Sequence, residues 1–315
     1  MSKTFFKIMK FSITIPAYKQ KFLYEAVESC LAQTYDDFEL IIVDDASPED
    51  LKSVVDRFQD PRIRYYRNEK NCGALDVVDN WNICLGYVTG DYVICMGDDD
   101  ELLPNCLEEY SKLIDKYPGL GVYHAWTEMI DEKGNIVNIQ ESRPEFETVS
   151  TMMFCRFRYN RLQYIGDWLF NVKMLRENKG FYKLPYAWGS DDVSVYIAAL
   201  EYGVANSQTP LFRYRVSSLT ISKGGFDKEK IEVINNLEDI FYSILDRESF
   251  ATEFQKKINK LCRDIIPHYI SDRRNLQLAN LFRNKGRQTV LWWIINGKKM
   301  KFNKLQVLKA WLKSF

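Results

Sequence analysis

The sequence predicts an α/β fold in which a mainly parallel central sheet is flanked by helices, followed by an all-helical C-terminal extension. Over the first half of the chain, short apolar runs alternate with segments whose apolar residues recur at helical spacing. The apolar runs are almost continuous, which is typical of parallel strands covered on both faces. Beyond residue 226, no segment carries a strong strand pattern.

The elements of the first part can be assigned in order along the chain. Ser47 before Pro48 is a typical N-cap followed by a proline in the first turn, so we expect the second helix to begin at Pro48. The expected strands are residues 11–15, 38–43, 63–66 and 92–96, and the expected helices are residues 22–33, 48–58 and 73–88.

The remaining pattern divides the chain into two regions. We expect a hairpin with strands at 122–130 and 136–137, then a mixed stretch with a helix after Ser190 and a strand near 211–215. Lys223-Gly224-Gly225 supplies a break near residues 222–227. The predicted domains are therefore residues 1–225 and a helical region at residues 226–315.

Composition excludes several classes of protein. The chain has 315 residues, equal numbers of acidic and basic residues, and no uninterrupted apolar run of membrane-spanning length. Its seven cysteines form no CxxC pair, and His124 and His268 are the two histidines, so a zinc site is not expected. Scattered cysteines without a secretory signal fit a reducing cytosol.

Acidic residues follow two of the predicted strands. Asp44 and Asp45 end the second strand, and Asp98, Asp99 and Asp100 follow the fourth. Ligands bind at the carboxyl ends of the strands in such sheets. Adjacent carboxylates repel one another unless a cation lies among them, and oxygen ligands suit Mg²⁺ or Mn²⁺. The alternative is a solvated acidic turn that caps the next helix.

Several motifs, in this order, resemble the opening of one enzyme family. They are Ile13-Thr14-Ile15-Pro16-Ala17-Tyr18, Ala32-Gln33-Thr34-Tyr35, Phe38-Glu39-Leu40-Ile41-Ile42-Val43-Asp44-Asp45-Ala46-Ser47, Asn71-Cys72-Gly73, Asn80-Trp81-Asn82, Gly90-Asp91-Tyr92-Val93, and Asp98-Asp99-Asp100 closed by Pro104. They are similar to those of family 2 glycosyltransferases of the GT-A fold, over roughly the first two-thirds of the chain. The resemblance implies that residues 1–225 form a Rossmann-like catalytic domain that uses a nucleotide sugar, with a nucleotide-binding half at about 1–103 and an acceptor half at about 104–225.

The resemblance also implies roles for residues at the strand ends. Asp45 would hydrogen-bond the nucleotide base, typically at uracil N3–H, and Asp99 would bind a divalent metal, Mn²⁺ or Mg²⁺, with Asp100 helping. The residues implied to bind the nucleotide sugar are Pro16, Tyr18, Asp44, Asp45 and Asp98. The family's more usual pattern has a further aspartate where Gly97 stands, so the number of protein ligands to the metal stays open.

A second acidic pair resembles the family's catalytic base. Inverting transfer needs a carboxylate that removes the proton of the acceptor hydroxyl. In Trp188-Gly189-Ser190-Asp191-Asp192, the resemblance makes Asp192 the base and lets Asp191 contact or orient the acceptor. We expect Trp188 at the acceptor site, because aromatic faces stack on sugar rings. From these residues alone, without the upstream motifs, a helix cap made by Ser190 and Asp191 is the favoured interpretation.

One arginine is implied to contact the diphosphate. Arg215 lies in a segment that matches the family's Tyr-Arg motif, and a guanidinium fork suits phosphate oxygens. The histidine that many members carry near Ser217 or Ser218 is absent from the sequence, so no metal role is assigned there.

The C-terminal region has a one-sided charge pattern. No acidic residue follows Asp272, whereas basic residues recur around tryptophan-containing apolar runs at 291–295 and 305–312. Basic side chains with interfacial tryptophans suit an anionic membrane surface. The alternative is that these helices pack on the catalytic domain and merely expose their lysines. Nucleic-acid binding is not expected, because lysine alone is unspecific.

These observations predict a hexosyl-type glycosyltransferase. It would move a sugar from a UDP-sugar to a saccharide or lipid-linked saccharide with inversion, in surface-polysaccharide biosynthesis, and lie in the cytoplasm, peripheral on the inner face of the cell membrane. A nucleotidyltransferase-type α/β enzyme would also need carboxylates and metal, but the glycine-rich phosphate loop expected for it is absent from the sequence. A catalytically silent carbohydrate-binding protein of the same fold is the remaining alternative, and the intact acids argue against it.

Overall fold

The computed structural model describes residues 9–217 and 227–315. The strands are β1 (Phe11–Ala17), β2 (Phe38–Asp44), β3 (Ile63–Arg67), β4 (Tyr92–Cys95), β5 (Glu101–Leu102), β6 (Val122–Ile130), β7 (Ile136–Ile139), β8 (Phe146–Glu147), β9 (Trp168–Asn171) and β10 (Val204–Arg215). The helices are α1 (Leu23–Leu31), α2 (Leu51–Val55), α3 (Val77–Tyr87), α4 (Cys106–Lys116), α5 (Val149–Tyr159), α6 (Val172–Glu177), α7 (Ser190–Ala199), α8 (Asp227–Arg247), α9 (Glu253–Lys285), α10 (Val290–Asn296) and α11 (Lys304–Leu312).

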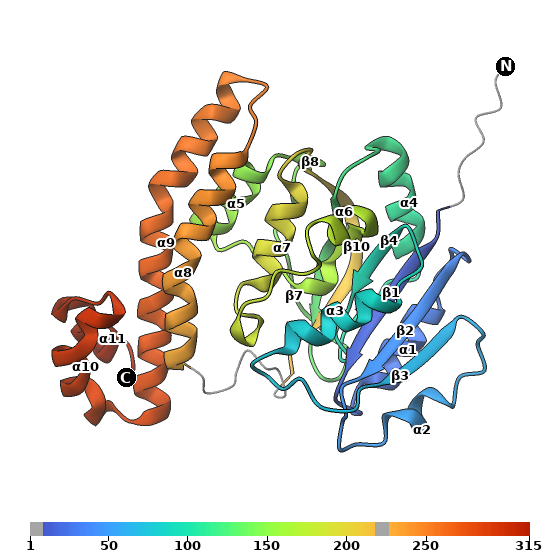
Figure 1. Cartoon of the computed structure of the whole chain (residues 1–315), viewed down its shortest axis with the longest axis horizontal. Coiled ribbons are helices and arrows are strands. Elements are labelled where there is room, and N and C mark those ends of the chain that lie inside the picture. Colours follow the sequence, from blue (N-terminus) through green and yellow to red (C-terminus); the bar gives the residue numbers. More distant parts are fainter. Residues whose placement is uncertain (1–8, 218–226) are drawn as a thin grey trace.

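The strands form one ten-stranded sheet in the order β3-β2-β1-β4-β9-β6-β10-β5, with β7 paired to β6 and β8 to β10. The first four strands are mutually parallel, as their near-continuous apolar runs predict. β9 lies between β4 and β6 and is antiparallel to both, so the second half of the sheet is mixed. The α/β class with flanking helices is confirmed (Figure 1).

Three predicted boundaries differ from those in the structure. The second helix begins at Leu51, capped by Asp50, because the Ser47 hydroxyl instead donates to the Tyr18 carbonyl (2.6 Å). α3 begins at Val77 rather than at Gly73, where φ of +75° turns the chain before the helix. β10 begins at residue 204, well before the predicted 211, because it pairs with both β6 and β8.

Two hydrophobic clusters cover the two faces of the sheet. Helices α1, α2 and α4 pack on one face, and α3, α5 and α7 pack on the other. The second cluster extends into α8 and α9, where Phe241 and Tyr269 pack against Phe157 of α5 at ring separations of 4.8 and 4.4 Å. The first two C-terminal helices therefore share a core with the sheet-containing region.

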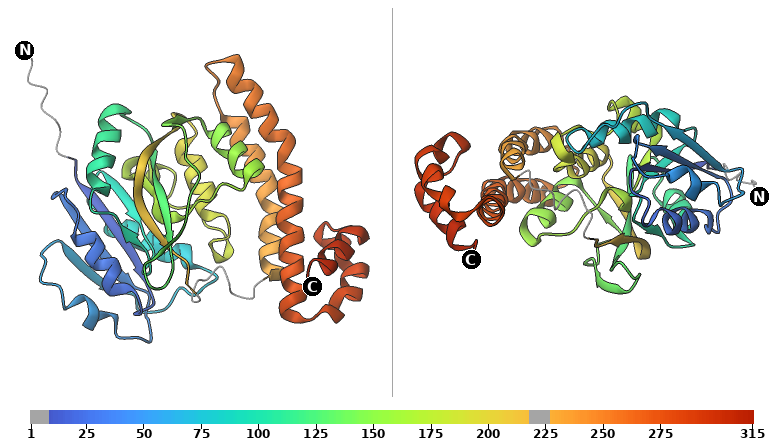
Figure 2. Two further views of the ribbon diagram at one scale, coloured as in Figure 1. Left: turned by 180° about the vertical axis from the view of Figure 1, so that it is seen from behind. Right: turned by 90° about the horizontal axis from the view of Figure 1, so that it is seen from below.

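The C-terminal helices lie on the side of the molecule away from β3. α8 and α9 run antiparallel to each other, and α10 and α11 lie beside the end of α9 (Figures 1 and 2). Phe282 and Trp293 belong to a third cluster that joins these last helices to α9. The predicted break at Lys223-Gly224-Gly225 falls outside the described residues. Within the described ranges, no helix has the length and hydrophobicity that crossing a bilayer requires.

Candidate active site

A cavity of about 680 Å³ opens at the carboxyl ends of β1, β2 and β4. Asp45 and the acids after β4 line one part of it, and the start of α7 lines another. Of the predicted site residues, those in the lining are Pro16, Tyr18, Asp45, Asp98, Asp99, Asp100, Trp188, Asp191 and Asp192. Segments far apart in the sequence therefore converge on one cavity.

Asp98 ties the loop after β1 to the loop after β4. One of its carboxylate oxygens accepts hydrogen bonds from the backbone N–H groups of Tyr18 and Lys19, both at 2.7 Å. Burial, opposed by the charge of Lys19, raises the pKa of Asp98 to about 6. Asp98 thus shapes the loops on which Tyr18 and Asp99 stand.

Asp99 and Asp100 direct oxygens toward the same small space. A Cβ placed on Gly97 would lie 2.9 Å from one Asp100 oxygen and 3.1 Å from one Asp99 oxygen. The other Asp100 oxygen accepts a hydrogen bond from the backbone N–H of Arg215 at 2.9 Å. Burial and the neighbouring Asp99 charge raise the pKa of Asp100 well above its usual range. Two carboxylate oxygens so placed would be stabilised by a cation.

This arrangement fits a magnesium or manganese ion whose ligands come partly from the protein and partly from a substrate. Among residues 9–217 and 227–315, no group of three or more potential metal-ligating side chains converges. Mg²⁺ sites commonly use one or two carboxylates and complete their coordination with water and substrate phosphates. The space beside Gly97 that a side chain would fill is the space into which both carboxylates point. A third aspartate at this position would crowd the pair.

Asp44 and Asp45 are separated by the geometry of the strand end. Asp45 lines the cavity, and its carboxylate is held by the Cys72 N–H (3.0 Å) and the Asn68 amide (2.8 Å). Asp44 is fully buried and outside the lining. It accepts hydrogen bonds from the Tyr65 hydroxyl (2.7 Å) and the Ser47 N–H (2.8 Å) and pairs with Arg67. Its contacts are those of a structural residue.

Arg215 also lies outside the cavity lining, although it was expected at the diphosphate. Its guanidinium donates to the Asp99 carbonyl (2.8 Å) and the Asp131 carbonyl (3.1 Å), and it pairs with Glu101. The side chain is 3% exposed. Arg215 therefore supports the acidic loop from behind.

The acids at the start of α7 lie in different surroundings. Asp192 is held by the Arg156 guanidinium (3.2 Å) and the Gln163 amide (2.8 Å). Asp191 accepts the Asp192 N–H at 2.9 Å. Burial and the Asp192 charge raise the pKa of Asp191 to about 7, and Arg156 opposes that rise.

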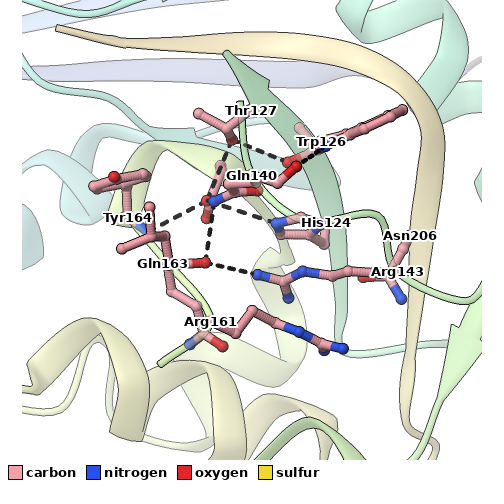
Figure 3. Close-up of polar contacts among 12 residues, drawn as sticks. His124, Trp126, Thr127, Gln140, Arg143, Arg161, Gln163, Tyr164 and Asn206 are labelled. Atoms are coloured by element: carbon pink, nitrogen blue, oxygen red, sulfur yellow. Dashed lines mark hydrogen bonds and ion pairs between the residues drawn. The ribbon is translucent and has the colours of Figure 1, made fainter. Parts of the chain in front are cut away.

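A buried polar cluster supports the loop that carries Gln163. The Asp167 carboxylate accepts hydrogen bonds from Gln140 (2.7 Å), Thr127 (3.3 Å) and the Tyr164 N–H (3.3 Å), and His124 lies 3.6 Å away (Figure 3). Burial raises the pKa of Asp167 to about 7 and holds that of His124 well below its usual value. His124 is thus a neutral, structural histidine.

Several lining residues were missed by the sequence analysis. Arg156 and Gln163 come from α5 and the loop after it, and Arg273 comes from α9. No motif marks any of them, because their position depends on how these helices pack against α7. Lys19 also lines the cavity. It directly follows Tyr18 in a recognised motif, and this was the one sequence signal that could have indicated its position.

Comparison with known proteins gives a family match. Residues 12–182 match the sequence model of a family described as "Glycosyl transferase family 2". One relative is a GalNAc(5)-diNAcBac-PP-undecaprenol beta-1,3-glucosyltransferase of Campylobacter jejuni, 34% identical over 131 residues that cover 40% of each chain. The chain spans between 36% and 46% of the length of the first curated relatives that it matches.

Solved structures share the fold at low sequence identity. Staphylococcus aureus TarS 1-349, solved in complex with UDP-GlcNAc, has a TM-score of 0.66 at 15% identity, covering 96% of this chain and 89% of that one. The mannosyltransferase PcManGT of Pyrobaculum calidifontis, solved with GDP-Man and Mn²⁺, has a TM-score of 0.53 at 16% identity, covering 97% and 87%. Both alignments extend over nearly the whole of this chain, C-terminal helices included.

Proposed function

Because this chain belongs to glycosyl transferase family 2, we propose that it transfers a sugar from a nucleoside-diphosphate sugar to an acceptor hydroxyl with inversion. The donor is a UDP-sugar, and the acceptor is a saccharide or lipid-linked saccharide of a surface polysaccharide. The observation that carries the proposal is the shared cavity. Asp45 and the acids after β4 lie in the same lining as the acidic pair of α7.

In this proposal, the strand-end residues bind the donor. Pro16, Tyr18 and Asp45 hold the nucleotide, and Asp98 fixes the loops around it. Asp99 and Asp100 would hold a divalent cation, whose charge would stabilise the leaving diphosphate. The fit of two carboxylates beside Gly97 supports this assignment. The complex of PcManGT with Mn²⁺ and a sugar nucleotide points the same way.

The acidic pair of α7 activates the acceptor. The acceptor oxygen attacks the anomeric carbon, the bond from that carbon to the diphosphate breaks, and the hydroxyl proton passes to a carboxylate. We assign this proton to Asp192, which is oriented by Arg156 and Gln163, and we assign Asp191 to contact or orient the acceptor. Trp188 lines the same cavity, and we assign its ring to stack on the acceptor sugar.

The test is binding and turnover of a panel of nucleotide sugars with and without Mn²⁺. We expect a UDP-sugar to bind with metal, Asp99→Ala to abolish that binding, and Asp192→Asn to keep binding while losing transfer. If no nucleotide sugar binds in any metal condition, a carbohydrate-binding protein replaces the enzyme. Release of diphosphate from a nucleoside triphosphate would instead indicate a nucleotidyltransferase.

We further propose that α10 and α11 attach the protein to the inner face of the cell membrane. Large apolar side chains on these helices and at the C-terminus are exposed: Leu291 (68%), Trp292 (51%), Ile295 (78%), Leu305 (61%), Leu308 (43%), Leu312 (63%) and Phe315 (72%). Exposed lysines lie among them: Lys298, Lys299, Lys301, Lys304, Lys309 and Lys313. With no acidic residue after Asp272, the charge complements an anionic bilayer.

A further inference from the structure

The C-terminal helices contribute a cation to the cavity. Among their described residues, Arg273 in α9 is the one that lines it. The guanidinium lies 5.4 Å from the ring centre of Trp188 and 5.6 Å from that of Tyr269. Contact with two aromatic rings holds this planar group in place and keeps its N–H donors oriented.

The donors of Arg273 have no protein acceptor. Within residues 9–217 and 227–315, its guanidinium makes no hydrogen bond or ion pair. Arg156, another cation of the lining, is committed to Asp192. Lys19, the third, adjoins Asp98 in the loop after β1. Arg273 is therefore the cation of the acceptor end whose hydrogen-bonding capacity is available to a ligand.

Its location relates it to the reacting hydroxyl rather than to the donor. Arg273 contacts Trp188. It also lies close enough to the α7 acids for its charge to lower the pKa of Asp191, although burial, Asp192 and Arg156 have larger effects on that pKa. The donor diphosphate is assigned to the acidic loop after β4. An anion bound by Arg273 would thus lie in the same part of the cavity as the proposed base.

We propose that Arg273 binds a phosphate group of the acceptor, so that the acceptor is a phosphate-linked saccharide modified close to its phosphate. A guanidinium fork matches phosphate oxygens with two parallel hydrogen bonds. The inference rests on the proposed transferase function and deepens it. It also makes α9 part of the active site.

The test is a titration of citronellyl phosphate into the protein saturated with UDP and Mn²⁺, so that the donor's own phosphate site is filled. The wild type is expected to bind the phosphate and not citronellol, its neutral counterpart. Arg273→Ala should weaken binding about tenfold to a hundredfold, as loss of charged hydrogen bonds predicts. Arg273→Lys should be intermediate, because it keeps the charge but loses the fork.

The control is Lys260→Ala, which removes an exposed cation elsewhere on α9. It should leave both affinities unchanged. Equal binding by wild type and Arg273→Ala, or no binding by the wild type, overturns the inference. Weaker UDP binding in Arg273→Ala also overturns it, because the guanidinium would then serve the donor. Failure of UDP itself to bind with Mn²⁺ would instead count against the transferase function.

Discussion

The two adjacent acids of α7 differ in their partners, and the difference predicts distinct variants. Asp192 is held by Arg156 and Gln163, whereas Asp191 has a pKa raised to about 7 by burial and by its neighbour. Asp192→Asn should lower kcat by about a hundredfold to ten-thousandfold, because it removes the base. Asp191→Asn should keep transfer within about tenfold, because Asp192 keeps its partners Arg156 and Gln163. It should also remove any inflection near pH 7 from the pH–rate profile, because the carboxyl with the raised pKa is gone.

The measurement is kcat against pH for both variants, with donor affinity measured in parallel. Donor binding should be unchanged in each, since neither acid belongs to the strand-end loops. If Asp191→Asn abolishes transfer and Asp192→Asn only shifts the profile, the two roles are reversed.

The acids after β4 predict that metal binding depends on pH. Burial raises the pKa of Asp98 to about 6, and burial with the Asp99 charge raises that of Asp100 further above its usual range. A proton and a divalent cation compete for such carboxylates. The affinity of the protein for Mn²⁺ in the presence of UDP should therefore rise between about pH 5 and about pH 7.5. Calorimetry in buffers of different ionisation enthalpy would detect proton release on binding. Affinity that is flat over this range would contradict the assignment of Asp100 to the metal.

Among the structural elements, the buried cluster behind the cavity should show its own pH dependence. The pKa of Asp167 is raised above its unfolded value to about 7 because the carboxyl is buried. The folded state therefore binds this proton more tightly, and the stability contribution is present below about pH 4 and lost as pH rises through about 7. Asp167→Asn should accordingly gain Tm relative to wild type between about pH 5 and about pH 8. Glu141→Gln, at an exposed carboxyl, is the control, and a Tm difference that does not change with pH would refute the prediction.

The contact between β6 and α7 depends on a glycine. A Cβ on Gly121 would lie 2.2 Å from the Ala198 carbonyl oxygen, so the helix could not stay at its present distance. Gly121→Ala should destabilise the fold by about 1–3 kcal/mol, a typical cost of overpacking. Gly86→Ala, in α3 with open space around it, should instead stabilise by up to about 1 kcal/mol. Urea unfolding of both variants gives the comparison, and equal effects would show that the close approach is tolerated.

For the molecule as a whole, the last two helices predict salt-sensitive membrane attachment. The protein should sediment with vesicles that contain phosphatidylglycerol and much less with phosphatidylcholine alone, and added salt should release it. Trp292→Ser combined with Ile295→Ser should reduce binding, because both side chains are exposed on α10. Leu261→Ser, at an exposed leucine of α9, should not. Equal loss in both variants would argue against a face made by α10 and α11.

Much of the parallel half of the sheet, and of the acids that follow its strands, could be predicted from the sequence by itself. The strands at residues 38–44 and 92–95 are short apolar runs, and each ends at acids. Such a pattern involves only residues that are neighbours in the chain, so it can be recognised without knowledge of the tertiary structure. Parallel strands then bring Asp45 and Asp99 to the same edge of the sheet. The helix expected after Ser190 does begin there, but its N-cap is Gly189 with no side-chain hydrogen bond, so the predicted cap by Ser190 and Asp191 is wrong.

The tertiary structure decided which of these residues face the cavity. Asp44 and Asp45 are adjacent in sequence, yet Asp45 lines the cavity, whereas the Asp44 carboxylate is hydrogen-bonded to Tyr65 and paired with Arg67. Arg215, which was predicted to contact the diphosphate, supports the acidic loop from behind, and Arg273 of α9 lines the cavity instead. Such choices depend on packing between segments far apart in the chain, where burial and partner geometry, not local pattern, set the orientation of each side chain.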